Sequence, residues 1–346
     1  MFTFATYSGK EACFLPASFD TCFGTAVVHH ITDVQYFLAQ VHSLLRPGGR
    51  AFFMEPNFEF HRALTATMAD VTAELMRDSR VSKQDIHGIL NWIAEVHCNV
   101  INSGDLEILA EREDKHLFVA QVFEEWGKAA GFGVAVALPC DPDPTGWNTI
   151  QVYLGQNGVG SQTLAAIQQY WQLIQAHHFG QLSARDQSPS YLFWLQKVTS
   201  RHRPEPATPA TSRWRCSKRR SRVSAELWLE IQARRHDEGV EIFAAGWCLA
   251  SGSVRAIQIT SGGIGRKLPI WRPRPDVHTR MNTNGKYPPL CSLCSGIEGR
   301  VRLGSTDIDQ ETVRLELELV TVDGRLLPAG TATPTLDGKI YKMHKA

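Results

Sequence analysis

The sequence has no long hydrophobic run and no excess of charge of one sign. No apolar stretch approaches the roughly 18 residues that a membrane-spanning helix needs, and the first residues lack the basic-then-apolar order of a secretory signal. The 346 residues carry 36 Lys and Arg against 35 Asp and Glu, a formal net charge of +1. This balance provides no overall attraction to nucleic acid or to an anionic membrane. We therefore expect no nucleic-acid partner and no membrane span.

Cysteine is sparse, with eight in the chain, and several stand inside apolar runs, among them Cys22 and Cys98. Such thiols are typical of free cysteines in a reducing compartment, which predicts a cytoplasmic protein. Cys291 and Cys294 form a single Cys-x-x-Cys, whereas a structural zinc site needs a second pair of ligands. The nearest candidate ligand, His278, has no partner beside it. The pattern therefore predicts no metal site.

A segment rich in proline and basic residues divides the chain. The length is sufficient for two domains, each with its own core. Residues 199–222 contain three prolines and then six basic residues between Ser212 and Arg222, which predicts an exposed linker that proteases cut first. We expect one domain over residues 1–198, the linker over 199–222, and a second domain over 223–346.

Short apolar strands alternate with helical patterns in the first domain, the order typical of an α/β fold. Residues 21–28 are nearly all apolar, as in a parallel strand that is buried on both faces. Apolar residues then recur at helical spacing from Val34 to Leu45, and Thr32 and Gln35 predict a capping box at the start of that helix. Pro47-Gly48-Gly49 is expected to end the helix, and residues 50–54 to form the next strand.

A mostly helical stretch interrupts this alternation. Residues 62–100 have helical patterns, and we interpret about 60–115 as an insertion that forms a lid. A helix over 119–130 and strands over 134–138 and 149–154 follow. The aromatic cluster at residues 191–194 is expected to pack against the sheet.

The second domain has a different pattern. From Thr312 to Val322, apolar and polar residues alternate, which predicts a strand with one buried face before an Asp323-Gly324 turn. Residues 241–249 and 254–259 also have the character of strands, with glycine-rich turns between them. We therefore expect a small antiparallel β-sandwich.

The most specific pattern in the chain lies between Ser18 and Asn57. It consists of a strand ending in His29-His30, an amphipathic helix, a Pro-Gly-Gly turn and a strand ending in Glu55-Pro56. This order resembles the back half of a class I S-adenosylmethionine (SAM) methyltransferase of the methyltransferase type 11 kind, and the resemblance extends over roughly residues 9–155. It implies a Rossmann-like sheet of order 3-2-1-4-5-7-6 with SAM across the carboxyl ends of its strands.

The same resemblance assigns strands 4, 5, 6 and 7 to residues 21–28, 50–54, 134–138 and 149–154. Family members begin with a strand that leads into D/E-x-G-x-G-x-G, whose backbone approaches SAM, and this run is absent from the sequence. Because only 20 residues precede Thr21, we expect a truncated sheet, weak or absent SAM binding, and an exposed edge at strand 21–28. Such an edge predicts self-association or the addition of a partner's strand.

The resemblance also implies cofactor-binding residues. Glu11 and Ala12 match the positions that face the adenine ring, with Glu11 in place of the usual Asp. Ala26 and His29, at the end of the strand over 21–28, match positions beside the cofactor.

Three residues at the carboxyl ends of the strands are candidates for catalysis: His29, His30 and Glu55. Methyl transfer to a hydroxyl requires alignment of the acceptor and removal of a proton, and a histidine with an ordinary pKa near 6.5 is a suitable base. Alternatively, His29 packs beneath the cofactor and His30 caps the following loop. Glu55 and Asn57 are also predicted to bind the acceptor, with a structural N-cap or loop role as the alternative.

The second domain carries a weaker resemblance. Its motifs are Gly246-Trp247, Arg274-Pro275-Asp276-Val277 and Ser295-Gly296. They resemble the "GW…RPDV…SGF" pattern of a β-sandwich found beside glycosyltransferases and methyltransferases of bacterial surface-polysaccharide synthesis, with Ile297 where Phe is usual. The resemblance implies a glycan, glycolipid or other small sugar-containing acceptor, or a non-catalytic binding or scaffold role. Alternatively, Trp247 and Val277 belong to the core and Arg274 and Asp276 form a buried structural pair.

Overall fold

The computed structural model describes residues 14–109, 112–198, 223–236, 239–251, 254–304 and 311–345. The predicted linker and the candidates Glu11 and Ala12 lie outside the described residues. The chain forms two compact units: unit 1 comprises residues 1–64, 111–150 and 175–213, and unit 2 comprises residues 65–110, 151–174 and 214–346. The division into separately folding domains at residues 199–222 stays a prediction.

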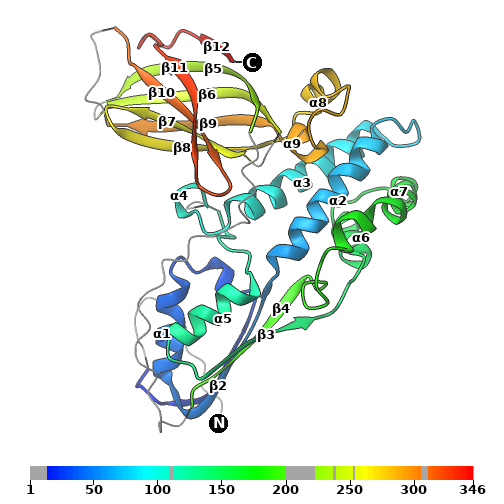
Figure 1. The fold of residues 1–346 in the computed structure, drawn as a ribbon, viewed down its shortest axis with the longest axis vertical. Coiled ribbons are helices and arrows are strands. Elements are labelled where there is room, and N and C mark those ends of the chain that lie inside the picture. Colours follow the sequence, from blue (N-terminus) through cyan, green and yellow to red (C-terminus); the bar gives the residue numbers. More distant parts are fainter. Residues whose placement is uncertain are drawn as a thin grey trace. The chain divides into compact units, whose positions relative to one another are not determined.

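Unit 1 is built on a four-stranded sheet in the order β1-β2-β4-β3 (Figure 1). Its strands are β1 (Phe19–Thr25), β2 (Leu45–Pro56), β3 (Val134–Cys140) and β4 (Ser190–Gln196). Strands β1 and β2 are parallel, whereas β4 runs antiparallel to both of its neighbours. The sheet has the order 4-5-7-6 that the methyltransferase resemblance implies, and the α/β prediction is confirmed.

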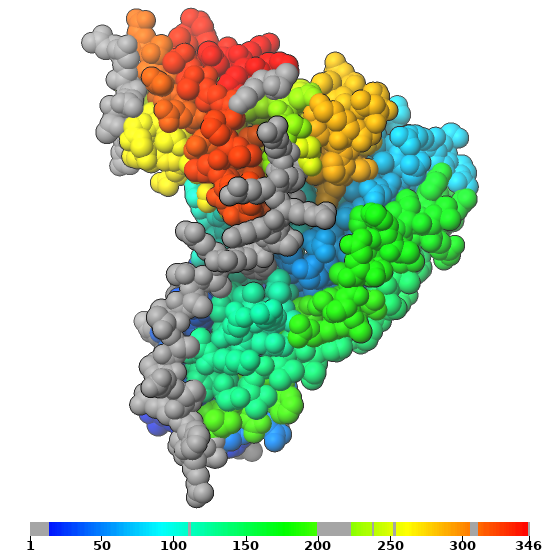
Figure 2. All heavy atoms as spheres, in the orientation of Figure 1, coloured from blue at the N-terminus to red at the C-terminus, as the bar shows by residue number. Residues whose placement is uncertain are grey.

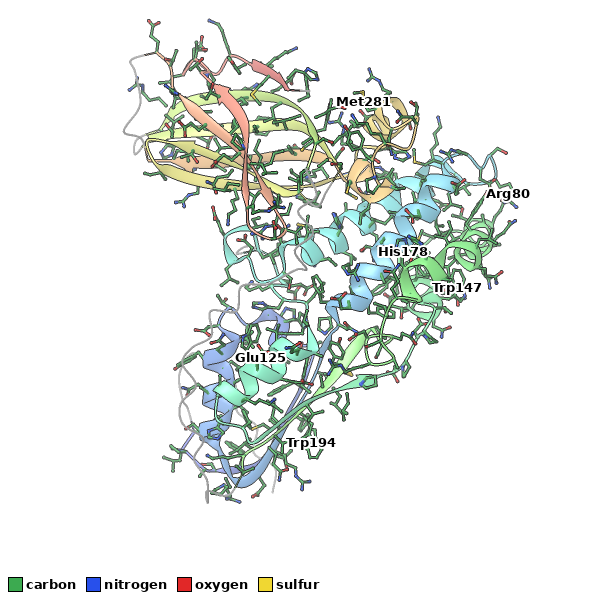
Figure 3. The ribbon with its side chains drawn as sticks, in the orientation of Figure 1. Arg80, Glu125, Trp147, His178, Trp194 and Met281 are labelled. Atoms are coloured by element: carbon green, nitrogen blue, oxygen red, sulfur yellow. The ribbon has the colours of Figure 1, made fainter. Side chains whose placement is uncertain are left out.

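Strand β4 lies at a different place in the sequence from the one predicted. Residues 149–154 belong to helix α6 (Trp147–Gln156), so the prediction of a strand there was wrong. The aromatic cluster is itself the strand: Tyr191 and Phe193 are fully buried, while Trp194, labelled in Figure 3, is only partly buried. A short run of β-branched and apolar residues fits both a strand and a helix, and this ambiguity explains the error.

Helices α1 (Val34–Leu44) and α5 (Ala120–Ala129) pack against the sheet and share its hydrophobic core (Figure 1). The capping box predicted at Thr32 and Gln35 was wrong. Asp33 is the N-cap, and its side chain accepts a hydrogen bond from the backbone N–H of Tyr36 at 2.9 Å. The helix begins at Val34, so Asp33 is the residue whose carboxylate reaches the third amide of the first turn.

The Pro-Gly-Gly turn also differs from its prediction. Helix α1 ends at Leu44, and residues 47–49 already belong to β2. Gly48 has a φ of +85°, a conformation that L side chains rarely adopt. A Cβ on Gly49 would lie 2.9 Å from the carbonyl oxygen of Arg46. Glycine is therefore needed at both positions for β2 to start immediately after the helix.

The predicted insertion is helical. It contains α2 (Phe58–Leu75), α3 (Lys83–Asn102) and α4 (Leu106–Leu109), and α7 (Ser161–Phe179) follows α6. Within unit 2, α3 and α4 pack on strands of the large β-sheet. Helix α7 (green in Figure 2) is exposed in part, and Leu173 on it is 77% exposed. Among the described residues, no helix has both the length and the apolar character needed to cross a membrane. A lid role for the insertion stays a prediction.

Unit 2 contains an eight-stranded antiparallel sheet in the order β11-β10-β7-β8-β9-β6-β5-β12. Its strands are β5 (Ala225–His236), β6 (Gly239–Ala250), β7 (Val254–Ser261), β8 (Ile264–Arg272), β9 (Gly296–Leu303), β10 (Leu315–Thr321), β11 (Leu326–Ala332) and β12 (Tyr341–Lys345). The first part of β8 pairs with β7, and its last residues pair with β9, so this strand joins the two halves of the sheet. One core contains side chains from both halves, and the predicted antiparallel β fold is confirmed.

The strand predictions in unit 2 were accurate. Strands β6 and β7 cover the predicted ranges, and Leu315, Leu317 and Leu319 on β10 are buried in alternation with glutamates. The turn at Asp323-Gly324 joins β10 to β11, with Gly324 at a φ of +80°. Two short helices, α8 (Pro275–Met281) and α9 (Pro289–Leu293), lie between β8 and β9 in the sequence.

Candidate functional site

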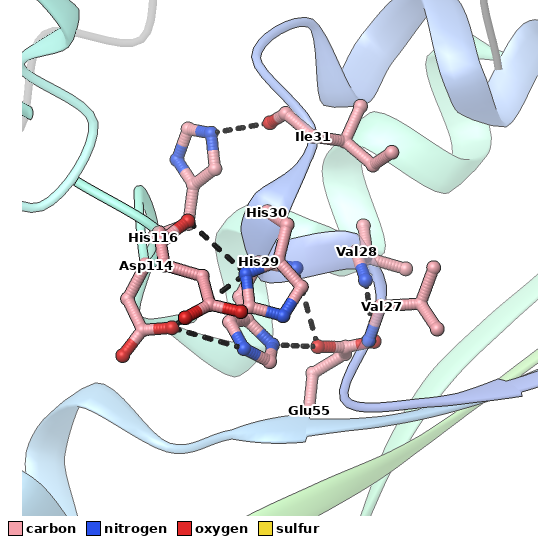
Figure 4. A network of polar contacts seen from close by, with 9 residues as sticks. Val27, Val28, His29, His30, Ile31, Glu55, Asp114 and His116 are labelled. Atoms are coloured by element: carbon pink, nitrogen blue, oxygen red, sulfur yellow. Dashed lines mark hydrogen bonds and ion pairs between the residues drawn. The ribbon is translucent and has the colours of Figure 1, made fainter. Parts of the chain in front are cut away.

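The structure brings the three predicted catalytic residues together at the carboxyl ends of β1 and β2 (Figure 4). His29 and His30 lie in a short 3-10 helix, η1 (Val28–His30), which follows β1. Glu55 lies at the end of the parallel strand β2. Asp114, which the sequence analysis did not single out, joins them from the loop before α5. The switch-point rule for open α/β sheets expects a ligand at such an edge.

Glu55 is buried, with 1% of its surface exposed, and both of its carboxylate oxygens are engaged. Its Oε1 accepts hydrogen bonds from the backbone N–H groups of Val27 and Val28, at 3.0 and 2.7 Å. Its Oε2 accepts from the backbone N–H of His29 at 3.2 Å and from the Nδ1–H of the same residue at 2.7 Å. The first backbone N–H groups of a helix have no acceptor within the helix, and the carboxylate oxygens provide one. Glu55 therefore holds η1 in place.

His29 lies between two carboxylates. Its Nδ1–H donates to Glu55, and its Nε2 lies 3.4 Å from Asp114 Oδ1. Burial alone would lower its pKa, but the hydrogen bonds and charges of Asp114 and Glu55 outweigh this effect and raise the pKa of His29 to about 9. The hydrogen bond with His29 in turn lowers the pKa of Asp114. At neutral pH the ring is a cation bound to two anions, a state that has no lone pair to accept a proton.

His30 is the more open of the two histidines, with 36% of its side chain exposed. Its Nδ1–H donates to the carbonyl oxygen of Glu113 at 3.0 Å, and the same nitrogen lies 3.6 Å from Asp114 Oδ1. The rings of His29 and His30 are tilted against each other, with centroids 3.9 Å apart. His30 therefore faces both the loop and water.

The loop that supplies Asp114 is fixed to η1 by main-chain contacts. The backbone N–H groups of Lys115 and His116 donate to the carbonyl oxygen of His29, at 2.9 and 3.2 Å. The ring Nε2–H of His116 donates to the carbonyl oxygen of Ile31 at 2.9 Å. Burial lowers the pKa of His116, which agrees with a neutral ring in this position. These three contacts place Asp114, and no sequence pattern indicates them, because the loop meets η1 more than 80 residues away along the chain.

Ala26 and Asn57 have structural contacts beside the cluster. Ala26 follows β1 at a φ of +53°, and its N–H donates to the carbonyl oxygen of Met54. Asn57 is fully buried, and its Oδ1 accepts from the backbone N–H groups of Glu59 and Phe60, at 2.9 and 3.3 Å. Asn57 therefore caps helix α2, the structural alternative stated for it. Cofactor binding by Ala26 and His29 and acceptor binding by Glu55 and Asn57 stay predictions.

The three motifs of the second domain meet in unit 2. Arg274 makes two hydrogen bonds to the Asp276 carboxylate, at 2.9 and 2.8 Å, and donates to the carbonyl oxygen of Gly246 at 3.2 Å. Val277 is buried in a small cluster against which Trp247 packs. The side chains of Arg274 and Asp276 are 28% and 50% exposed, so this ion pair is not fully buried. These contacts give the motifs a structural role that holds α8 against β6.

Comparison with known proteins supports the resemblance over the first part of the chain. The model of the methyltransferase domain family matches residues 3–53. This stretch contains β1, the two histidines of η1, helix α1 and most of β2, so the resemblance is confirmed there. No curated protein matches the chain.

Several solved structures are also similar to part of this chain. Phosphoethanolamine N-methyltransferase 2 of Haemonchus contortus, bound to phosphomonomethylethanolamine and S-adenosylhomocysteine, is 16% identical over 55% of this chain and 36% of its own, with a TM-score of 0.25. The YcgJ protein of Bacillus subtilis is 12% identical over 56% of this chain and 70% of its own, with a TM-score of 0.26. A Galdieria sulphuraria protein described as a sarcosine dimethylglycine methyltransferase is 10% identical over 56% of this chain and 58% of its own, with a TM-score of 0.27. The chain spans about a third of the length of the Haemonchus enzyme.

Proposed function

We propose that this chain is a SAM-dependent methyltransferase relative that acts on a sugar-containing or glycolipid acceptor. The observation that supports the proposal best is the sheet order β1-β2-β4-β3 with η1 and Glu55 at the carboxyl ends of its parallel strands. In a class I methyltransferase, this edge faces SAM and the acceptor. The sugar-containing acceptor rests on the motifs of the second domain alone.

The three catalytic candidates divide into two roles in this proposal. His29 and Glu55 are positioning residues, because their contacts with each other and with the backbone fix η1. His30 is the residue that faces the acceptor, since its ring is the more exposed of the two. An in-line methyl transfer requires this kind of fixed geometry together with a group that receives the acceptor's proton.

The cofactor is tested by adding a segment that carries the glycine-rich run. These 346 residues contain no D/E-x-G-x-G-x-G run, so we expect weak SAM binding by the chain alone. A two-strand segment with this run, taken from a related enzyme and joined ahead of Met1, should restore a micromolar dissociation constant, about −8 kcal/mol by calorimetry. The matched control is the same fusion with its loop glycines replaced by alanine. A fusion that folds and still binds no SAM would contradict the proposal.

The acceptor is tested with the fusion that binds SAM. Transfer of a labelled methyl group is measured to sugars, glycolipids and small amines. We expect transfer to the sugar-containing acceptors and a loss of about 100-fold in His30→Ala, because general-base groups contribute about this much. Transfer to amines alone would rule out the acceptor class.

A non-catalytic binding or scaffold role in a carbohydrate pathway is the second candidate. The saturated contacts of Glu55 and the cationic state of His29 favour it, since neither group has a free lone pair for proton transfer. This role requires that the unmodified chain binds a glycan. It also requires that the fusion transfers no methyl group.

The buried thiols support a proposal for the compartment. Cys248 and Cys294 are buried thiols that form no disulfide among the described residues. Burial raises the pKa of Cys248 to about 12, so its thiol is protonated and unreactive. We propose that the protein belongs to the reducing environment of the cytoplasm, where such thiols stay reduced.

A further inference from the structure

The cluster at the end of β1 has a second chemical property. The nitrogens of His29 and His30 and a carboxylate oxygen of Asp114 are all groups that ligate metals, and they lie within 4.8 Å of one another. His29 Nε2 is 3.4 Å from Asp114 Oδ1, and His30 Nδ1 is 3.6 Å from the same oxygen (Figure 4). In a tetrahedral site with metal–ligand bonds of about 2.0–2.2 Å, neighbouring ligand atoms are about 3.3–3.6 Å apart. The distances from Asp114 Oδ1 to the two histidine nitrogens thus match the spacing of such a site, and the two nitrogens lie within 4.8 Å of each other.

We propose that His29, His30 and Asp114 form a binding site for a divalent transition-metal ion of the zinc type. Two imidazoles and one carboxylate favour Zn²⁺, Co²⁺ or Fe²⁺ over Mg²⁺ and Ca²⁺, which prefer oxygen ligands. The site shares His29 and His30 with the proposed methyl-transfer site, but binding of a metal can be tested without SAM.

A buried carboxylate orients the first of these ligands. Glu55 accepts the Nδ1–H of His29 at 2.7 Å, which directs Nε2 toward Asp114. Histidines that bind metals almost always donate their other N–H to a carboxylate or carbonyl in this manner. Glu55 is itself fixed by the backbone amides of Val27, Val28 and His29, so the ring has little freedom to turn away.

The other two ligands are close to water. The side chains of His30 and Asp114 are 36% and 49% exposed, against 10% for His29. A cation can therefore reach the site from solvent and keep a water molecule in its remaining position, as in zinc sites with three protein ligands. The carbonyl oxygen of Glu113, 3.0 Å from His30 Nδ1, is a further oxygen near the same point.

In the metal-free state, a proton occupies the place of the cation. When a metal binds, the proton between His29 Nε2 and Asp114 must leave, because a ligating nitrogen needs a free lone pair. For the same reason, the Nδ1 proton that His30 donates to the carbonyl oxygen of Glu113 must move to Nε2 of that ring. Metal binding is therefore expected to release protons into the buffer.

The experiment uses the full chain without an affinity tag, first treated with a chelator. Zn²⁺ is titrated by calorimetry in two buffers of different ionisation enthalpy, and Co²⁺ is titrated by visible absorption, which reports the coordination geometry. We expect one ion per chain, a dissociation constant of 1 μM or tighter (about −8 kcal/mol) and release of protons. Asp114→Asn and His30→Gln should each weaken binding by at least about 10-fold, since changes to the outer shell alone have effects of 10- to 100-fold.

The matched control replaces the other adjacent histidine pair. His177 and His178 on α7 have ring centroids 4.8 Å apart, and their replacement by glutamine should leave binding unchanged. Circular dichroism confirms that each variant is folded, and the use of two ligand variants keeps the test decisive if one of them misfolds. The proposal fails if no stoichiometric binding is seen, if neither ligand variant weakens it, or if the control variant abolishes it. Because SAM takes no part, failure here leaves the methyltransferase proposal untouched.

Discussion

Glu55 and His29 form a buried ion pair in which the Nδ1–H of the imidazole donates to the carboxylate at 2.7 Å. Glu55 lies at the end of β2, and His29 lies in η1, which follows the neighbouring parallel strand β1. The carboxylate also accepts hydrogen bonds from three backbone N–H groups at the start of η1. Glu55 therefore balances the charge of the histidine and also provides acceptors for these N–H groups. This contact therefore links the fold of unit 1 to the arrangement of its candidate site.

Replacement of Glu55 by glutamine should destabilise unit 1 strongly. In the variant, the side-chain NH₂ group faces N–H groups that donate to the carboxylate in the wild type, such as the backbone N–H of Val28 or the Nδ1–H of His29. The substitution also removes the negative charge that balances buried His29. Breaking a buried pair on one side costs about 3 kcal/mol or more. The free energy of unfolding in urea measures this cost, and hydrogen exchange of the peptide over residues 45–56 assigns it to unit 1.

The matched control is Glu59→Gln. Glu59 pairs with Arg62 at 2.8 Å on the surface of α2, where the side chains are 33% and 53% exposed. Exposed pairs contribute about 0–1 kcal/mol. Equal costs for the two substitutions would show that Glu55 does not have the structural role inferred from its contacts.

The stability of unit 2 should decrease at mildly acidic pH because of His97. Its Nδ1 is buried without a hydrogen-bond partner among the described residues, and burial lowers the pKa of this histidine to about 4. As the pH falls below about 6.5, His97 becomes protonated in the unfolded chain but stays neutral in the folded chain. The contribution of His97 is therefore complete above pH 6.5 and is lost as pH falls to about 4, for a total of about 3 kcal/mol.

This prediction is checked by urea unfolding at several pH values. His97→Leu removes the titrating ring, so its stability should fall less between pH 7 and pH 4 than that of the wild type. His87→Leu, at an exposed position on the same helix, should follow the wild-type profile. Parallel profiles for the wild type and His97→Leu would mean that water reaches the ring.

Asp105 should couple the inserted helices to the β-sheet of unit 2. Its carboxylate pairs with Arg255 at 2.9 Å and with Lys267 at 3.1 Å, and its side chain is 10% exposed. Asp105→Asn leaves the mostly buried Arg255 without its counter-charge, at a cost of about 2–3 kcal/mol. Glu230→Gln, which breaks an exposed pair with Lys342, should cost less than about 1 kcal/mol.

Hydrogen exchange shows which elements respond to Asp105→Asn. If unit 2 is cooperative, exchange should accelerate both in residues 83–109 and in residues 254–272, which carry the two partners. The predicted domain boundary at residues 199–222 places these two regions in different domains. Acceleration confined to residues 83–109 would support that boundary.

Strong periodic patterns predicted most of the fold. The helical spacing after Val34 and the alternation on β10 each correspond to an observed element, because local period and burial agree there. The apolar run before His29 also contains a strand, β1, but the prediction that it is buried on both faces was wrong, because no residue of β1 is buried. The last strand of unit 1 was misplaced because residues 149–154 and 191–194 both suit a strand. Pairing with β2 and β3 decides between them, and pairing is a tertiary property.

The site was predictable in part for a similar reason. His29, His30 and Glu55 lie within a motif whose strands end at one edge, so their meeting could be expected from the sequence. Asp114 stands in a charged loop with no periodicity and reaches η1 through backbone hydrogen bonds. The roles of Glu55 and Asn57 as buried acceptors of backbone N–H groups also depend on contacts that composition does not encode.

The exposed edge of unit 1 should drive association between copies of this chain. Strand β1 pairs with β2 on one side, and no strand of the described residues pairs with its other side. Phe23, in the middle of β1, is 84% exposed. An unpaired strand edge that carries a large apolar side chain is a template for pairing with another strand. We expect the mass measured by light scattering to rise above that of the monomer as concentration increases.

Phe23→Lys tests whether this edge is the contact. A lysine keeps the strand folded, because the side chain already faces water, but it opposes the approach of a second copy by charge repulsion and loss of apolar surface. The variant should stay monomeric at concentrations where the wild type associates. Leu173→Lys on α7, where the leucine is 77% exposed, makes the same chemical change away from any strand edge and should associate like the wild type. If both lysines reduce association equally, general surface hydrophobicity is the cause; if the wild type is monomeric throughout, the β1 edge recruits no second copy.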